Sequence, residues 1–195
     1  MPIIDGMLVQ SGGSKPHVIF IMHTLSKQFP YNIWKIGGKV DRTTAAGGFS
    51  HHSEGRACDI YLDAFDPQDK QLGDLLFEMF YLNATELKVD HTIWNSRIWS
   101  VVTLGGPSAY TNAANGPHTD HVHVAFKDEQ LNVEPLNFVA LCKQVYENYV
   151  LNGDNVVDRA DGLYGKAFNP KKPNKRLTQE QRRVIMTVKM GFKGL

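Results

Sequence analysis

Five of the eight histidines in this 195-residue chain fall in two short segments, and each segment also contains aspartate. The first reads Ser50-His51-His52-Ser53-Glu54-Gly55-Arg56-Ala57-Cys58-Asp59, and the second reads His118-Thr119-Asp120-His121-Val122-His123-Val124. Neutral imidazole and carboxylate are common zinc ligands, and a catalytic zinc ion takes three protein ligands and leaves one position open. Together the two segments predict a metal site.

Strands are expected to bring the two segments together. The sequence predicts strands at 57–62, 89–94, 97–103 and 121–126, where β-branched and aromatic residues are frequent. Residues two apart in a strand point to one face, so His121 and His123 share a face. If the first and last of these strands are antiparallel neighbours, Asp59 and His123 can lie side by side. His52, in the preceding loop, then completes a triangle of ligands.

Helices are expected on both sides of this run of strands. One begins at Pro16 and ends before Pro30, a second begins at Pro67, and a third carries the apolar residues of 136–149. Asn95-Ser96 indicates a tight hairpin between two of the strands. This order predicts an α+β domain, in which helices flank a small antiparallel sheet.

Charge divides the chain into two parts. Residues 1–151 hold 11 Lys and Arg against 16 Asp and Glu, whereas 152–195 hold 10 against 4. The polar stretch 152–155 is typical of a loop. We therefore expect a compact domain at 1–151 and a basic extension at 152–195. Thr178 and Gln181 form a capping-box pattern, which predicts that the extension ends in a helix.

Composition excludes several classes of protein. With 42% hydrophobic and 21% charged residues, the chain has the composition of a soluble globular protein. Its longest apolar run, 18–22, is far shorter than a membrane-spanning helix, and its N-terminus shows no signal-peptide pattern. Two cysteines cannot form a disulfide scaffold. A net charge of +1 gives no general attraction to nucleic acid or anionic lipid.

The two histidine segments resemble the signature of a known superfamily. The pattern Ser50-x-His52-x-x-Gly55-x-Ala57-x-Asp59, followed by His121-x-His123, is similar to that of the LAS zinc peptidases. These include D-Ala-D-Ala carboxypeptidases and dipeptidases, phage L-alanyl-D-glutamate endolysins, murein endopeptidases and the hedgehog signalling domain. Ile93-Trp94-x-x-Arg97-Ile98-Trp99 also looks like a segment of some bacterial members. The resemblance spans about 32–126.

The resemblance implies a role for individual residues. His52, Asp59 and His123 correspond to the three ligands of a Zn²⁺ cofactor. Asp120, three residues before the last ligand, corresponds to the general base, where many members have glutamate. Such a base would take a proton from the nucleophilic water and pass it to the leaving amine.

The resemblance also implies a catalytic role for three further residues. His121 and His118 are similar to histidines that stabilise the oxyanion or orient water in murein endopeptidases. Arg42 is similar in placement to an arginine that polarises the substrate carbonyl.

The function implied is a zinc-dependent peptidase that cuts peptidoglycan stem peptides or cross-links. Asp120 and the additional histidines favour an endopeptidase over a D-Ala-D-Ala carboxypeptidase or dipeptidase. A binding module with a catalytically silent zinc ion is the alternative from another class. A metal-dependent nuclease is disfavoured, because the predicted core domain is acidic and phosphate backbones require a cationic surface.

The expected place of action is the periplasm or cell wall, where peptidoglycan lies. Because no export signal is visible, we expect release on lysis, as for an endolysin, or delivery by a secretion system as an antibacterial toxin. An immunity protein is an expected partner in the toxin case.

Overall fold

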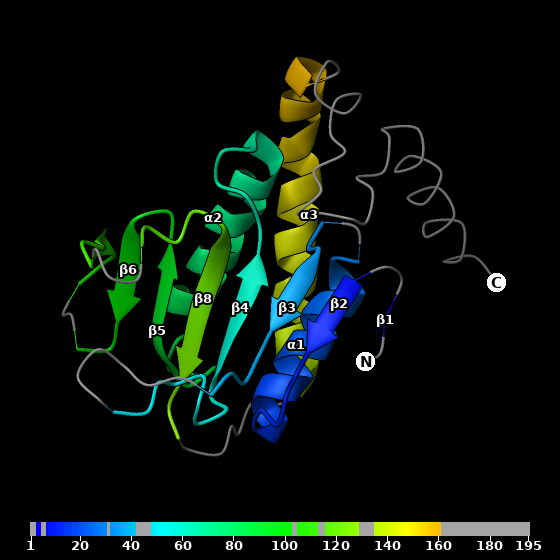
Figure 1. The fold of residues 1–195 in the computed structure, drawn as a ribbon. Helices are drawn as coiled ribbons and strands as arrows, with labels where there is room; N and C mark the ends of the chain where they lie inside the picture. Colours follow the sequence, from blue (N-terminus) through cyan, green and yellow to red (C-terminus); the bar gives the residue numbers. More distant parts are fainter. Residues whose placement is uncertain are drawn as a thin grey trace.

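The computed structural model describes residues 3–4, 7–30, 32–41, 48–102, 105–112, 116–128 and 135–160. Within these residues the chain forms one eight-stranded sheet and three helices (Figure 1). In chain order the elements are β1 (Ile3–Ile4), β2 (Met7–Gln10), α1 (Pro16–Gln28), β3 (Lys35–Gly37), β4 (Ala57–Tyr61), α2 (Pro67–Leu82), β5 (Val89–Trp94), β6 (Arg97–Ser100), β7 (Ser108–Ala109), β8 (His121–Phe126) and α3 (Pro135–Ala160). The α+β class predicted from the sequence is confirmed.

The sheet is larger than expected. Its strand order is β1-β2-β3-β4-β8-β5-β6-β7. The β2–β3 pair is parallel and every other neighbouring pair is antiparallel, so the sheet is mixed. The short strands β1, β2, β3 and β7 were not predicted from the sequence. The four predicted strands form the centre of the sheet and its β5–β6 hairpin.

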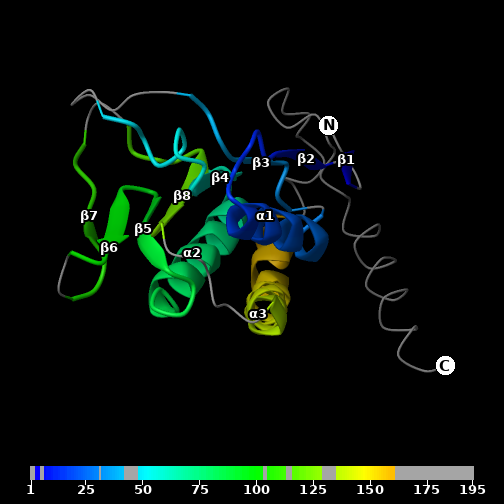
Figure 2. The ribbon, with the colours of Figure 1, turned by 90° about the horizontal axis from the view of Figure 1, so that it is seen from below.

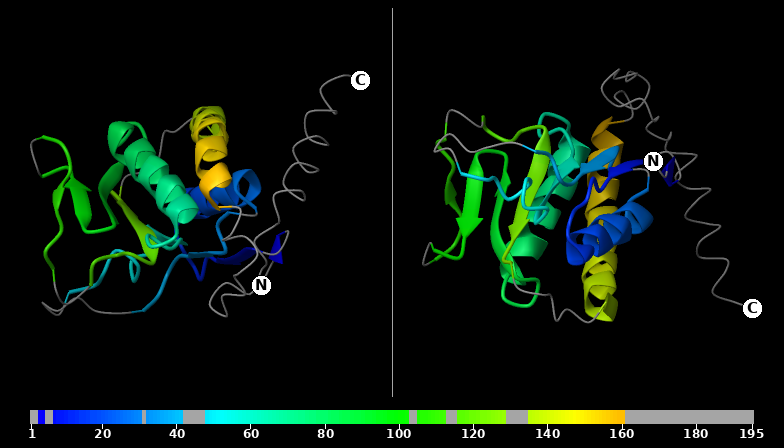
Figure 3. Two further views of the ribbon diagram at one scale, coloured as in Figure 1. Left: turned by 90° about the horizontal axis from the view of Figure 1, so that it is seen from above. Right: turned by 60° about the horizontal axis from the view of Figure 1, so that its bottom comes forward.

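All three helices cover one face of the sheet (Figure 2; Figure 3, left). Two of them begin as predicted: α1 starts at Pro16, and α2 starts at Pro67. The Asp66 side chain accepts hydrogen bonds from the backbone N–H groups of Gln68 and Asp69, which caps α2. The helices therefore form a single layer, and the opposite face of the sheet is free of them.

The hydrophobic core lies between this helical layer and the sheet. In β4 and β8 the core-facing side chains are Cys58, Ile60, Val122 and Val124, all fully buried. Because strand side chains alternate, the residues between them point to the other face. The pairing register then sets Asp59 opposite His123.

The hairpin predicted at Asn95-Ser96 is confirmed. Both residues have positive φ, 47° and 62°, as a type I′ turn requires, and they join β5 to β6. Strand β6 ends at Ser100, three residues earlier than predicted.

The loop predicted at 152–155 is wrong, because α3 continues through this stretch to Ala160. A single glycine costs a helix only about 1 kcal/mol, so Gly153 among polar residues does not end it. The helix predicted near Thr178 and Gln181 lies outside the described residues, as does most of the proposed basic extension. None of the helices described has the length and apolar character needed to cross a membrane.

Candidate metal centre

Three ligand atoms from two distant segments meet on the sheet face opposite the helices. His52 Nε2 lies 3.1 Å from Asp59 Oδ1 and 3.2 Å from His123 Nδ1. His123 Nδ1 lies 2.8 Å from Asp59 Oδ1. All three residues are at least nine-tenths buried. The structure thus brings together the three residues that the sequence predicted as metal ligands, in a group that could hold a metal ion.

Local backbone geometry fixes the position of His52. The loop turns back at Gly55, whose φ is +71° and whose N–H donates to the His52 carbonyl oxygen at 2.9 Å. A Cβ at Gly55 would lie 3.0 Å from the carbonyl oxygen of Gly13. Positive φ and close approach both require glycine, which explains the spacing between His52 and Gly55.

A backbone carbonyl orients the His52 ring. His52 Nδ1 donates to the carbonyl oxygen of Gly38 at 2.8 Å, since a carbonyl oxygen can only accept. In the neutral ring this leaves the Nε2 lone pair directed at Asp59 and His123. Metal-ligating histidines are oriented by this kind of outer hydrogen bond.

The separations between the three atoms suit a small divalent cation. Ligand atoms that share a tetrahedral zinc ion at about 2.0–2.1 Å are roughly 3.3 Å apart. The observed separations, 2.8 to 3.2 Å, are slightly shorter. Two imidazoles and one carboxylate match the donor set of catalytic zinc sites.

The electrostatic surroundings of Asp59 and His123 favour the protonation states that can bind a metal ion. Burial by itself would raise the pKa of Asp59, but hydrogen bonds with His123 and His52 hold that pKa well below its usual range. Burial lowers the pKa of His123 to about 3. At neutral pH the carboxyl is therefore ionised and the His123 imidazole is neutral, as metal coordination requires.

Asp120 and His121 form a hydrogen-bonded pair beside the three ligands. His121 Nδ1 donates to Asp120 Oδ1 at 2.8 Å, and His121 Nε2 lies 3.6 Å from Asp59 Oδ1. The Asp120 side chain is 76% exposed. The hydrogen bond from His121 lowers the pKa of Asp120, which is therefore an ionised partner of the ring. Of the two side chains, His121 is the one whose contact with the ligand group the structure shows.

His118 is buried next to this pair. Its ring centroid lies 4.7 Å from that of His121 and 5.1 Å from that of Tyr110. Its Nδ1 donates to the Gly116 carbonyl oxygen at 3.2 Å. Burial lowers the pKa of His118 to about 4, so the ring is neutral at pH 7. With Nδ1 protonated, Nε2 is a hydrogen-bond acceptor.

Comparison with known protein families identifies the family to which the chain belongs. The family model for the C-terminal domain of VldE matches residues 10–123, more than half of the chain. The chain belongs to this family. The matched segment begins in β2 and ends at His123, so it contains the three candidate ligands His52, Asp59 and His123. A search of the curated proteins and of the solved structures found no match.

One predicted site residue is not described by the structure, and one neighbour of the site was not predicted. Arg42 lies outside the described residues of this VldE-family domain. His91, which the sequence analysis did not single out, stacks on His123 with ring centroids 5.2 Å apart. A lone histidine within a strand gives no signal by itself, and only the pairing of β5 with β8 shows that His91 lies beside the ligands.

Proposed function

We propose that this chain is a zinc-dependent metallopeptidase that hydrolyses peptide bonds in peptidoglycan stem peptides or cross-links. The observation that carries the proposal is the convergence of His52, Asp59 and His123 on the sheet face opposite the helices. The resemblance of the same residues to the LAS signature supports it. A Zn²⁺ ion held by such a group lowers the pKa of a bound water toward about 7 and polarises a carbonyl group.

The Asp120–His121 pair is suited to proton transfer. Because His121 donates its Nδ1–H to Asp120, its Nε2 is free of a proton in the neutral ring and faces the side of Asp59. We assign His121 as the group that accepts the proton of the attacking water and returns it to the leaving amine. Asp120 then acts through His121, as a positioning residue that stabilises the imidazolium. This assignment differs from the sequence-based one, in which Asp120 is the base.

His118 has a narrower role than the sequence suggested. A neutral ring that donates Nδ1–H to Gly116 has no second proton to give to an oxyanion. Its other nitrogen can accept a hydrogen bond from water or from a substrate N–H. We therefore assign His118 to orienting water or substrate and not to stabilising the oxyanion.

The choice of scissile bond is part of the proposal. We favour an endopeptidase, with a D-Ala-D-Ala carboxypeptidase or dipeptidase as the alternative. Since the substrate is cell-wall material, we place the activity in the periplasm or cell wall.

Mass spectrometry of digested peptidoglycan tests the proposal. Purified peptidoglycan is incubated with zinc-loaded protein, with chelator-treated protein and with an Asp59→Asn variant. New fragments should appear only in the first sample. A new internal amine identifies an endopeptidase, whereas loss of terminal D-Ala identifies a carboxypeptidase.

A histidine far from the site provides the matched control. His23 lies on α1, in the helical layer on the other face of the sheet. His23→Gln should digest peptidoglycan as the wild type does. Failure of the zinc-loaded wild type on several wall types would refute the peptidase and favour a zinc-containing binding module.

A further inference from the structure

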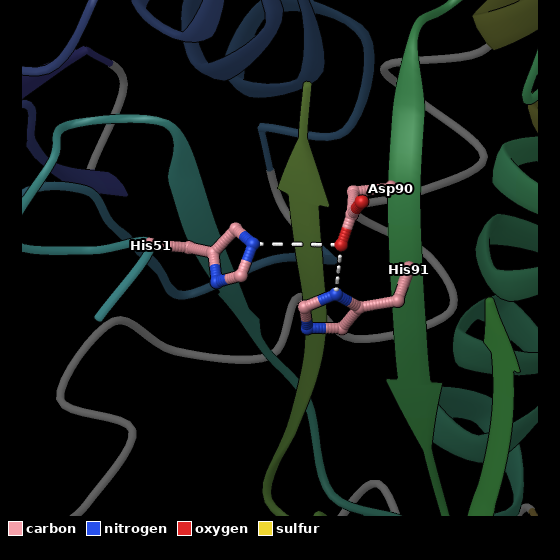
Figure 4. A group of neighbouring side chains, drawn as sticks. All are labelled: His51, Asp90 and His91. Atoms are coloured by element: carbon pink, nitrogen blue, oxygen red, sulfur yellow. Dashed lines mark hydrogen bonds and ion pairs between the residues drawn. The ribbon is translucent and has the colours of Figure 1, made fainter. Parts of the chain in front are cut away.

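A second group of potential ligands lies on the same face of the sheet. Asp90 and His91 project from β5 toward His51, which comes from the loop before β4, and β8 passes between them (Figure 4). His91 Nδ1 lies 2.8 Å from Asp90 Oδ2, and His51 Nε2 lies 3.4 Å from the same oxygen. The ligand atoms of all three residues lie within 4.8 Å of one another.

An irregularity in β5 makes this grouping possible. Consecutive strand residues normally point to opposite faces, so Asp90 and His91 would be separated in a regular strand. The β5–β8 register shifts between Val89 and His91. Val89 is fully buried in the core, while Asp90 and His91 both lie outside it. The bulge therefore directs two adjacent side chains to the face that carries His52, Asp59 and His123.

The strand positions next to this group carry small side chains. His91 is paired with Ala125 in β8, and Ala125 is paired in turn with Ala57 in β4. The strand positions next to the second group thus carry only methyl side chains. The nearby cation Arg56 is engaged by Glu54, with Nε 2.6 Å from Oε2. That pairing reduces its repulsion of a bound cation.

Of the two contacts that Asp90 makes with histidines in this group, only the one with His91 has the length of a hydrogen bond. The 2.8 Å contact of His91 with Asp90 is an ordinary hydrogen bond. The 3.4 Å separation of His51 and Asp90 is longer than the usual N–H···O distance of about 2.7–3.2 Å. It is close to the separation of roughly 3.3 Å between ligands of one zinc-sized ion.

We propose that His51, Asp90 and His91 form a second binding site for a divalent transition-metal cation, distinct from the site of His52, Asp59 and His123. The side chains are 30%, 31% and 18% exposed, so an ion can enter and keep open coordination positions. Two imidazoles and a carboxylate favour ions of the zinc and cobalt type over calcium or magnesium. The site requires no assumption about the reaction that the chain catalyses.

Zinc stoichiometry tests the second site directly. Chelator-treated protein is dialysed to equilibrium against buffered Zn²⁺, and bound zinc per chain is measured by elemental analysis. The wild type should bind two equivalents, and Asp90→Asn and His51→Gln should each bind one. Asp59→Asn should also bind one, whereas Asp59→Asn combined with Asp90→Asn should bind none.

Two controls protect the interpretation. Asp41→Asn, which removes a carboxyl group with an 89% exposed side chain, should leave two equivalents bound. Circular dichroism should show that Asp90→Asn and His51→Gln keep the wild-type fold. One equivalent in the wild type, or two in Asp90→Asn, would overturn the second site. The measurement uses no substrate, so its outcome is separate from that of the peptidase test.

Discussion

Asp59 and His123 are direct partners across the β4–β8 pair, and their side chains meet with Oδ1 and Nδ1 2.8 Å apart. The strand register therefore sets the spacing of two of the three candidate ligands. A slip of one residue would turn either side chain into the helical layer, where Cys58 and Val124 now pack. The core residues of these strands thus hold the register on which the candidate metal centre depends.

Asp59→Asn should abolish high-affinity metal binding at this centre. The amide keeps the size of the side chain but removes the negative charge held between His52 and His123. We expect at least a 100-fold loss of zinc affinity at this site, measured by competition with a chromophoric chelator. Asp41→Asn is the matched control. Wild-type affinity in Asp59→Asn would contradict the assignment of the ligand group.

Substitutions in the Asp120–His121 pair should separate the two roles. His121→Gln should lower kcat by about 10²–10⁴-fold, because it removes the proton acceptor that we propose. Asp120→Asn should have a smaller effect and should shift the acidic limb of the kcat profile to lower pH, because the imidazolium loses its anionic partner. Both variants should keep zinc bound at the first centre. A larger loss in Asp120→Asn than in His121→Gln would restore Asp120 as the direct base.

The metal-free protein should lose stability as the pH falls below about 6.5. The pKa values of His123 and His118 are lowered to about 3 and about 4, so in this range the unfolded chain binds protons that the folded chain does not. Each histidine should then reduce the free energy of unfolding by about 2 kcal/mol between pH 7.5 and pH 5. Urea unfolding in chelator at the two pH values measures this change.

The His118→Gln variant measures the contribution of His118 to this pH dependence of stability. His118→Gln removes a titrating group, so its stability should change less between the same two pH values than that of the wild type. An equal pH dependence in both proteins would show that His118 is not a buried neutral imidazole.

Gly55→Ala should disturb the loop that holds His52. The new Cβ combines positive φ with a 3.0 Å approach to the carbonyl oxygen of Gly13. We expect a loss of about 1–3 kcal/mol in the free energy of unfolding, together with weaker zinc binding. Gly106→Ala is the matched control, because nothing lies within 4 Å of its added Cβ. Equal thermal midpoints for the two variants would contradict the role given to Gly55.

The sequence predicted the first ligand group because alternation and spacing are local properties. His121 and His123 share a face in any strand, and the Gly55 turn is visible as a glycine at a fixed distance from His52. The neighbouring relation of β4 and β8 was an assumption that the structure confirmed.

Other features depend on information that is not local. The bulge that directs Asp90 and His91 to one face arises from pairing with β8, more than 30 residues away in sequence. The parallel pairing of β2 with β3 depends in the same way on the path of the chain around α1. The sequence did not predict the continuation of α3 past 151, because glycine and asparagine at 152–155 are typical of loops. The structure shows that the helix continues through them.

The single helical layer has an evolutionary consequence. The helices and the hydrophobic core lie on one side of the sheet, and the two groups of potential metal ligands lie on the other. Substitutions in these potential ligands can therefore accumulate on one side without changing the hydrophobic core on the other. Two members of this family can differ in these residues and still share the same hydrophobic core.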